Sequence, residues 1–297
     1  MAAELDADVL LAGVAAAMSP IGLEEVPELM SRVDRKYIVT GPTMAALAAE
    51  LGDRFAVLKI GARRQFRYSS TYFDTPDLLT FRQHRQDRRR RFKVRTRTYL
   101  DGGGQWLELK LNGARGSTDK HRIPYDDAPG QTLTPEAMDF VRDTLLTELH
   151  LIAPETLGPV LSTDYRRVTF IDPSGAARLT CDTGLSCRDG QASASARRDL
   201  VLLESKSADG RAWVDKVLRG LGARPVSVSK YCLAVAALRH LSANRWRPVL
   251  RRYLVHRPEP EARRLVPRGS PDCRGQAAGR EGRWAASDVG SRLSAGL

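Results

Sequence analysis

Cationic side chains occupy every second position of one short stretch of the sequence. In the segment 88–97, RRRRFKVRTR, Lys93, Arg95 and Arg97 alternate with Phe92 and other uncharged residues. Side chains two residues apart on a β-strand lie on the same face, so the segment predicts a strand with one cationic and one apolar face. Arginine and lysine donate charge-assisted hydrogen bonds to phosphate oxygens. Such a face favours the binding of a phosphorylated anion.

The same alternation returns in other segments of the chain. The charged positions are Arg32, Asp34 and Lys36, Glu108 and Lys110, Lys120 and Arg122, Arg178 and Asp182, and Glu204 and Lys206. An ordinary antiparallel sheet with one charged face in water is the simpler interpretation, but cations predominate here. Two cations about 7 Å apart repel by about 0.6 kcal/mol in water and about 2.4 kcal/mol at an effective dielectric constant of 20. We therefore expect an anion to neutralise this surface.

Turn and cap signals predict an α+β fold. Residues 92–112 predict a hairpin around the turn that begins at Asp101. A helix is predicted over 134–150 with Thr134 as its N-cap, and another begins at Ser229. If helices cover the apolar strand faces, the charged faces line an antiparallel β-barrel with the helices packed outside. A lumen of cations with one or two glutamates suits a phosphate chain and a divalent metal ion.

Composition narrows the class of partner. The chain has 297 residues and a net charge of +12, which favours an anionic partner. Aromatic residues make up only 6%, which disfavours RNA recognition by base stacking. There is no Walker or G-x-G-x-x-G motif for a nucleotide. The four cysteines form no C-x-x-C pair, and no basic residue precedes the apolar run at 9–18, so we expect a cytoplasmic protein without a zinc site.

The chain divides into three predicted segments. Residues 1–29 form an N-terminal helical segment, and residues 30–243 form the domain that carries the alternating strands. Residues 244–297 are rich in arginine, glycine and proline and lose apolar periodicity. This composition predicts a disordered basic tail.

Eight motifs carry a resemblance to a known family. In order they are RKY, YFDT, KVRTRTY, LELK, DYRRVTF, RLTCDT, LLESKS and SKYCLA. The set resembles the VTC (vacuolar transporter chaperone) domain, in the polyphosphate polymerase branch of the triphosphate tunnel metalloenzymes. The resemblance implies a barrel-shaped tunnel that binds ATP through its triphosphate, together with Mn²⁺ or Mg²⁺. It also implies transfer of the terminal phosphoryl group to a growing polyphosphate chain.

The resemblance and the strand alternation together select site residues. The expected catalytic residues are Lys36, Arg95, Arg97, Lys110 and Glu204. Further phosphate ligands implied by the motifs are Lys120, Arg167, Arg178 and Lys230. The alternation adds Arg32, Lys93, Arg122 and Lys206 as phosphate ligands, and Glu108 beside Glu204 as a metal ligand. In the motif YRRV the alternation leaves open whether Arg166 or Arg167 points inward.

Two departures from the wider superfamily bear on the activity. The segment 32–36, RVDRK, stands where many members have E-x-E-x-K, which favours a polymerase over a simple triphosphatase. Ser227 stands where related sequences can have a second lysine.

The alternatives are a tunnel-fold hydrolase of inorganic triphosphate or nucleoside triphosphates, and a non-enzymatic binder of polyphosphate or nucleic acid. ATP and polyphosphate are the expected partners, without a specific nucleic acid. Association with a membrane protein and the oligomeric state stay open.

Overall fold

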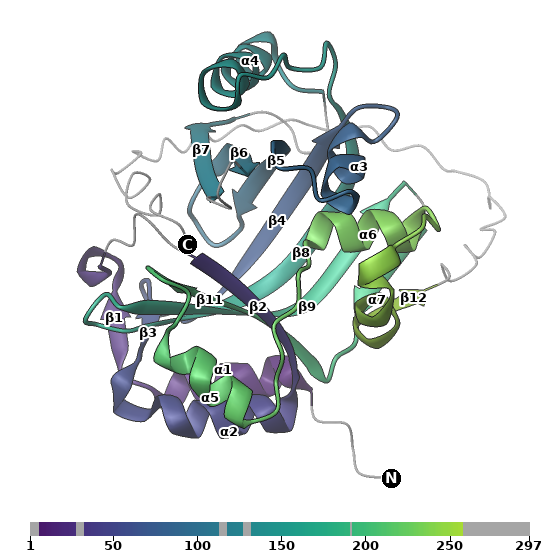
Figure 1. Ribbon diagram of the computed structural model, residues 1–297. Helices are drawn as coiled ribbons and strands as arrows, with labels where there is room; N and C mark the ends of the chain where they lie inside the picture. The colour runs from purple at the N-terminus through teal and green to yellow at the C-terminus, as the bar shows by residue number, and fades with distance from the viewer. Residues whose placement is uncertain (1–5, 28–32, 113–117, 127–131, 191, 258–297) are drawn as a thin grey trace, which may run out of the picture.

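A computed structural model of the protein describes residues 6–27, 33–112, 118–126, 132–190 and 192–257 (Figure 1). The strands are β1 Pro20–Gly22, β2 Val33–Thr40, β3 Ala56–Lys59, β4 Gln65–Asp74, β5 Arg91–Tyr99, β6 Gln105–Asn112, β7 Thr118–Pro124, β8 Gly158–Ile171, β9 Ala177–Asp189, β10 Ala192–Ala196, β11 Leu200–Ser207 and β12 Leu254–Arg257. The helices are α1 Ala7–Ala17, α2 Gly41–Leu51, α3 Leu79–Arg85, α4 Pro135–Leu149, α5 Trp213–Gly220, α6 Lys230–Leu238 and α7 Arg247–Tyr253, with short 3-10 turns η1 Leu23–Glu25, η2 Gly52–Arg54 and η4 Asn244–Trp246.

The twelve strands form one sheet in which antiparallel pairs dominate. Its main order is β12-β10-β9-β8-β4-β5-β6-β7, while β11 pairs with β9 and β2, and β3 pairs with β8 and β1. Among the described strands, β7 and β2 each pair with one neighbour only, so the sheet is not closed. An ion pair of 3.6 Å between Asp34 on β2 and Lys110 on β6 spans the open side. The predicted α+β fold, with an antiparallel sheet and helices outside, is confirmed.

Two helix starts agree with the caps in the sequence. Thr134 accepts a hydrogen bond from the Ala137 amide at 3.3 Å at the start of α4. Ser229 accepts one from the Cys232 amide at 3.4 Å, which makes Lys230 the first residue of α6. None of the helices in the described ranges is long and apolar enough to cross a membrane.

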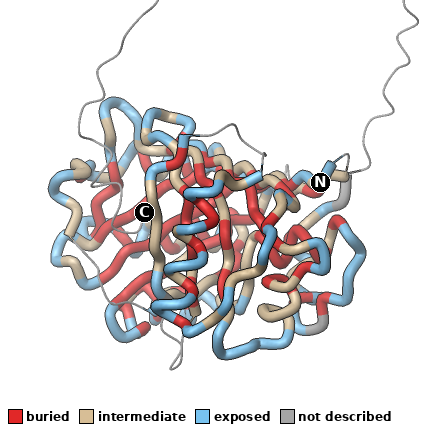
Figure 2. Tube along the Cα trace, turned by 90° about the horizontal axis from the view of Figure 1, so that it is seen from above, coloured by how far each residue is buried: buried red, intermediate tan, exposed pale blue. Residues whose placement is uncertain are grey.

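The apolar strand faces meet the helices in separate clusters. Helices α1, α2 and α5 lie together on one side (Figure 1), where they pack against Val201 and Leu203 of β11. Helix α4 covers Val94 of β5 and Leu109 of β6 on another side. Buried residues follow the strands through the interior, whereas exposed residues gather in the outer turns (Figure 2). Because alternate residues point to opposite faces, this packing leaves the charged face of each strand on the concave side.

A third cluster covers one end of the concave side. It contains α6 together with Ile38 and Leu202, which are paired across β2 and β11. These two residues share strand faces with Lys36 and Glu204. Helix α6 therefore lies over the same surface that carries the charged residues, and its first turn adjoins them.

The C-terminal boundary differs from the prediction. Residues 244–257, which were expected to be disordered, form η4, α7 and β12, and β12 pairs with β10. Trp246 is 3% exposed and Tyr253 is fully buried, so this segment completes the third cluster. The prediction was wrong for these residues because their contacts are with distant parts of the chain, which local periodicity does not report. The rest of the predicted tail, 258–297, lies outside the described residues.

Candidate functional site

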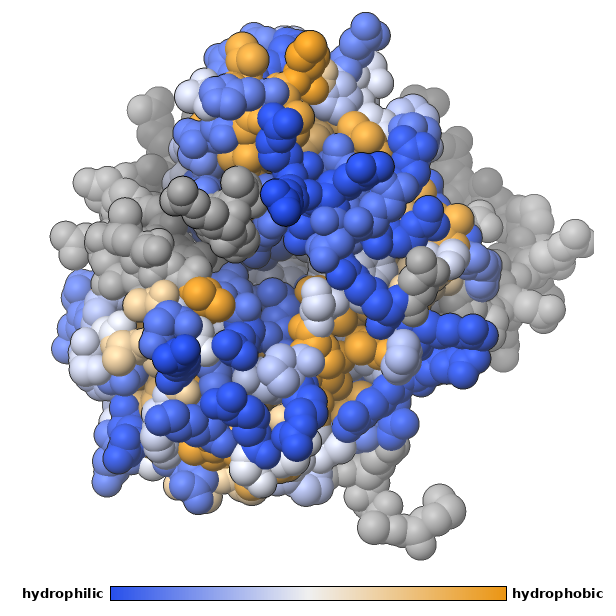
Figure 3. Space-filling model, in the orientation of Figure 1, coloured by the Kyte–Doolittle hydropathy of each residue, from blue (hydrophilic) through white to orange (hydrophobic). Residues whose placement is uncertain are grey.

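A cavity opens on the concave side of the sheet, next to the first turn of α6. Hydrophilic residues predominate around the centre of the face shown in Figure 3. The cavity is lined by Asp34, Lys36, Tyr72, Lys93, Arg95, Arg97, Glu108, Lys110, Lys120, Arg167, Leu202, Glu204, Lys206, Val228, Ser229 and Lys230.

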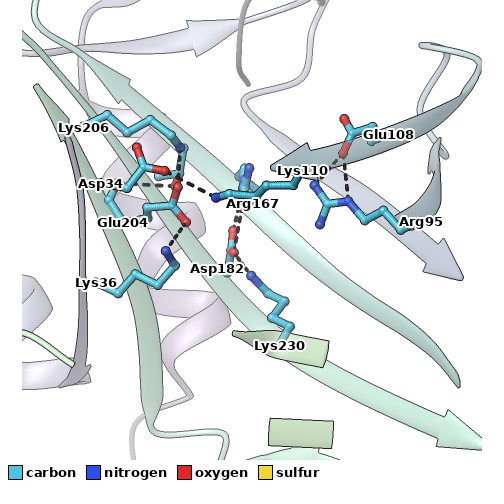
Figure 4. A network of polar contacts seen from close by, with 11 residues as sticks. Asp34, Lys36, Arg95, Glu108, Lys110, Arg167, Asp182, Glu204, Lys206 and Lys230 are labelled. Carbon is cyan, nitrogen blue, oxygen red and sulfur yellow. Dashed lines mark hydrogen bonds and ion pairs between the residues drawn. The ribbon is translucent and has the colours of Figure 1, made fainter. Parts of the chain in front are cut away.

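Glu204 on β11 lies between two lysines (Figure 4). Its Oε2 is 3.5 Å from Lys36 Nζ and its Oε1 is 3.0 Å from Lys206 Nζ. The strand register places Glu204 directly opposite Lys36. Burial raises the pKa of Glu204, but Lys206, Lys36 and Lys110 outweigh burial and hold this pKa well below its usual value. The carboxylate is therefore anionic at neutral pH.

Glu108 on β6 holds three cations in place. Its Oε2 accepts hydrogen bonds from Arg95 Nε at 2.8 Å and Arg95 Nη2 at 2.5 Å. Arg97 Nε is 3.8 Å from the same oxygen, and Lys120 Nζ is 3.6 Å from Oε1. Burial raises the pKa of Glu108, and the three cations, led by Arg95, outweigh this effect and lower it well below its usual value. The arrangement fixes the arginine side chains before any ligand arrives.

Asp182 on β9 forms a second anchoring point that the sequence reasoning did not select. Its Oδ1 and Oδ2 accept hydrogen bonds from Arg167 Nε at 2.6 Å and Nη2 at 2.9 Å, and it also pairs with Lys230. Burial raises the pKa of Asp182, but Arg167 and Lys230 bring it to about 2. The ion pairs connect β8, β9 and α6 at the floor of the cavity (Figure 4). The sequence could have indicated Asp182, because it lies four residues after Arg178 and therefore on the same face of the strand.

Tyrosines also contact the cavity cations, and the sequence reasoning missed them. Arg95 Nη1 donates to the Tyr72 hydroxyl at 3.1 Å. Lys230 Nζ lies 4.3 Å from the centre of the Tyr165 ring, and Arg167 Cζ lies 5.3 Å from it. Tyr165 lies two residues before Arg167 in the motif DYRRVTF and shares its face, but the alternation identifies it only once Arg167 is known to point inward.

Two lysines of the cavity have strongly lowered pKa values. Burial lowers the pKa of Lys93 to about 7, and the nearby cations Lys110 and Lys36 add to this effect. Burial also lowers the pKa of Lys120 to about 7, against the attraction of Glu108. Burial and neighbouring cations therefore oppose full protonation of these lysines, which favours an anion as the ligand of the cavity.

Most of the predicted site residues meet at this cavity. Those that line it are Lys36, Lys93, Arg95, Arg97, Glu108, Lys110, Lys120, Arg167, Glu204, Lys206 and Lys230.

The remaining predicted residues lie elsewhere. Of the two alternatives in the motif YRRV, Arg167 lines the cavity, whereas Arg166 lies on the opposite face of β8 and pairs with Asp8 of α1 at 3.0 Å. Arg122 does not line the cavity but stacks over Trp106 at 4.2 Å. Arg178 also lies away from the cavity lining and donates to the Pro27 carbonyl at 2.9 Å. Arg32 lies outside the described residues.

The carboxylates best placed for a divalent metal ion are Glu204 and Asp34, which both line the cavity. In the described part of the chain, no three His, Cys, Asp or Glu side chains are grouped for a metal. Mg²⁺ is commonly held by one or two carboxylates together with substrate phosphates, so this donor set fits a metal that arrives with a phosphate ligand. Glu108 fits less well, because a divalent cation there would face three fixed cations.

Comparison with solved structures finds distant likenesses. The PH1819 protein from Pyrococcus horikoshii OT3 is 11% identical, with a TM-score of 0.41, over 70% of this chain and 99% of that chain. A proposed adenylate cyclase from Bacillus halodurans is 16% identical, with a TM-score of 0.42, over 67% of this chain and 94% of that chain. These likenesses are too distant to bear on function. Comparison with curated proteins finds no match.

The family comparison covers the whole candidate site. The model of the VTC domain matches residues 31–239, which is more than half of the chain. Every residue that lines the cavity lies within this range. The order of motifs in the sequence and this match agree, and the chain belongs to the VTC domain family.

Proposed function

We propose that the protein is a metal-dependent phosphotransferase that moves the terminal phosphoryl group of ATP to an inorganic polyphosphate chain. Membership of the VTC family supports a function related to polyphosphate or triphosphate. The observation that carries the proposal is the cavity itself, in which lysines and arginines from several strands outnumber the carboxylates and surround that of Glu204. A polyanion with a divalent metal ion matches this distribution of charge.

Prepositioned cations account for most of the chemistry that this site offers. Phosphoryl transfer needs positioning and electrostatic stabilisation more than covalent participation by the protein. Glu108 holds Arg95 and Arg97, and Asp182 holds Arg167 and Lys230, in the absence of ligand. These cations neutralise phosphate oxygens without a cost of reorganisation when the ligand binds.

The side of the cavity formed by β2 and β11 supplies the residues that would hold the metal. Glu204 and Asp34 would hold Mn²⁺ or Mg²⁺, which would supply positive charge to neutralise the phosphates. Lys36 and Lys206, which pair with Glu204 when no ligand is present, can then turn to the phosphates. The acceptor is the end of a phosphate chain and is already anionic, so the reaction needs no general base from the protein.

Incubation of the protein with ATP and Mn²⁺ tests the proposal. Gel electrophoresis and a phosphate assay separate the outcomes, because a polymerase yields a ladder of long phosphate chains and ADP. Release of orthophosphate without a ladder would replace the proposal with a triphosphatase. Binding of polyphosphate without turnover of ATP would leave a non-enzymatic binder. Omission of the metal serves as the control for metal dependence.

A further inference from the structure

The arginines at the start of the alternating segment are not used by the candidate site. Arg88, Arg89 and Arg90 occupy the loop between α3 and β5 and are exposed. Together with Arg82 they line a groove on the surface, which we call the outer groove. Its remaining lining residues are Leu79, Gln83, Gln86 and Leu151.

The loop lies against an opening of the central cavity. Asp87, inside the loop, pairs with Arg91 at 3.3 Å and with Arg245 at 3.1 Å. Arg245 Nη2 also donates to the His84 carbonyl at 3.1 Å. Arg91, Arg245 and His84 line this opening. The residues that line both the opening and the cavity are Asp34, Lys36, Lys93, Lys110, Val228 and Ser229.

Strand β5 connects the cavity to the loop with a row of cations. Arg97, Arg95, Lys93 and Arg91 occupy alternate positions and share one face, at intervals of about 7 Å. The Arg97 side chain is 4% exposed and the Arg91 side chain is 18% exposed, and Arg88, Arg89 and Arg90, which come before them in the chain, are exposed. The row therefore runs from the buried part of the cavity to Arg91 at the opening, and Arg91 Nη1 donates to the carbonyl of Arg88, which lines the outer groove, at 2.5 Å.

The charge of the outer groove is poorly compensated. Arg88 Nε donates to the uncharged Gln86 Oε1 at 3.0 Å, and Arg90 Nη1 donates to the Leu149 carbonyl at 3.2 Å. Arg89 makes no hydrogen bond or ion pair with the part of the chain that the structure describes. Among the residues that the structure describes, Arg82 is the one arginine of the groove with a carboxylate partner, Asp77. A groove with this excess of positive charge attracts an extended anion.

We infer that the outer groove binds a polyphosphate chain where the chain emerges from the cavity. The inference rests on the proposed function, because it takes the ligand of the cavity to be a phosphate chain. Arg88 and Arg89 are the residues that would contact the emerging segment. Within the described ranges, no aromatic side chain lines the groove, so these residues offer nucleic acid bases no ring on which to stack. A phosphate chain needs only the cations.

Chain length is the property that separates the outer groove from the cavity. A tripolyphosphate is short enough to be held by the cavity alone, whereas a long chain that fills the cavity also reaches the loop. Loss of the outer contacts should therefore weaken binding of long chains selectively. During synthesis it should also release products earlier and shift them to shorter lengths.

The double variant Arg88→Ala/Arg89→Ala tests the inference in the full-length protein. It spares Arg90, which holds the end of α4 through the Leu149 carbonyl. Arg198→Ala/Arg211→Ala, which removes the same charge from exposed positions away from the groove, is the matched control. Calorimetry without ATP gives the affinities for tripolyphosphate and for long-chain polyphosphate. We expect the double variant to bind the long chain about tenfold more weakly than the control does, with tripolyphosphate affinity equal in both.

Three results would overturn the inference. The double variant could match the control for the long chain, or it could lose affinity for both ligands equally. Single-stranded RNA could also bind as tightly as long-chain polyphosphate and depend on the same arginines, which would indicate a general polyanion surface. Because the measurement needs no turnover, a failure of the proposed transferase activity leaves the binding result readable. Conversely, if the protein is an active polymerase and the double variant keeps its long-chain affinity, this inference is contradicted while the proposed function stands.

Discussion

At the scale of single residues, Glu204 combines a lowered pKa with a position that faces the cavity. Its carboxylate is anionic because Lys36 and Lys206 hold its pKa low, and it faces the cavity instead of being enclosed by the protein. A carboxylate in this position can exchange its lysine partners for a metal ion when phosphate arrives to pair with the lysines. Glu108, by contrast, is 1% exposed and serves three cations at once.

The variant Glu204→Gln should therefore lose activity but not binding. We expect turnover to fall roughly 100-fold or more and the metal requirement to rise, because a hard anionic ligand has been removed. Tripolyphosphate binding without metal should persist or tighten, since Lys36 and Lys206 lose their competing anion. Steady-state kinetics over a metal titration and calorimetry measure the two effects. Glu136→Gln, at an exposed position on α4, is the control. Near-normal metal-dependent turnover in a destabilised Glu204→Gln would show that Glu204 is not the ligand.

Lys93 should make ligand binding depend on pH. Its pKa is about 7 in the empty cavity, so at about pH 8 the folded protein holds it mostly neutral, whereas an ordinary lysine is protonated there. An anion in the cavity raises this pKa again, and also that of Lys120, so tripolyphosphate binding should take up protons above pH 7 and not well below it, in part through Lys93. Calorimetry in buffers of different ionisation enthalpy measures the uptake. Lys93→Arg keeps the charge but does not titrate, and equal uptake by this variant and the wild type would refute the assignment.

At the scale of elements, Asp74 at the end of β4 joins α3 and α6. Its carboxylate accepts hydrogen bonds from the Thr80 amide at 2.9 Å, the Phe81 amide at 3.0 Å and the Tyr231 hydroxyl at 2.5 Å. The Tyr231 ring stacks on Tyr72 with centroids 5.1 Å apart. Since Tyr72 holds Arg95, and Tyr231 follows Lys230 on α6, this one carboxylate supports both Arg95 and the first turn of α6.

Replacement of Asp74 by asparagine should destabilise the fold. The amide group of asparagine turns a donor toward donors, so at least one buried partner is left without an acceptor. We expect a loss of about 2–3 kcal/mol in the free energy of unfolding, against about 1–2 kcal/mol for Tyr231→Phe. Urea unfolding followed by circular dichroism measures both. If Asp74→Asn proved no more destabilising than Tyr231→Phe, the contacts of Asp74 with the amides at the start of α3 would contribute little to the free energy of unfolding.

At the scale of the whole molecule, the empty cavity opposes folding because it gathers cations. A ligand that binds only the folded state stabilises it by mass action, by about 2.7 kcal/mol at a concentration 100 times its dissociation constant. Tripolyphosphate with metal should therefore raise the melting temperature. Sodium chloride at matched ionic strength should do much less, since it only screens the charges. Thermal unfolding in the two media makes the comparison, and equal shifts would indicate an ordinary solvated basic surface.

In the C-terminal region, residues up to 257 should contribute to stability, whereas residues after 257 should not. Truncation after residue 244 removes Trp246 and Tyr253, which are buried in the cluster around α6. Loss of a large buried aromatic residue costs about 3–5 kcal/mol, a large part of the total stability of a typical domain. Truncation after residue 257 keeps these contacts and should leave the melting temperature and turnover nearly unchanged. Thermal unfolding of the two truncated proteins decides the point, and equal stability would contradict the packing seen here.

Much of the site could be predicted from the sequence because strand alternation is a local property. Lys93, Arg95 and Arg97 share a face wherever β5 lies, and the apolar residues between them must be covered. The same reasoning selected Lys36, Glu108, Lys110, Glu204 and Lys206, all of which line the cavity. The helix starts at Thr134 and Ser229 followed from caps that act within one turn.

Tertiary structure decided what depends on contacts between distant segments. Arg167 points inward and Arg166 outward, and the strand register shifts just before them, between Asp164 and Arg166. Pairing with β9 determines that shift, so alternation within β8 alone could not predict it. The same holds for residues 244–257, which lack periodicity but bury two aromatic side chains against α6 and pair with β10. The sequence by itself therefore determined which residues are charged, apolar or capping along each element. The fold decided which of them meet, because ion pairs such as Asp182 with Lys230 form between residues 48 positions apart.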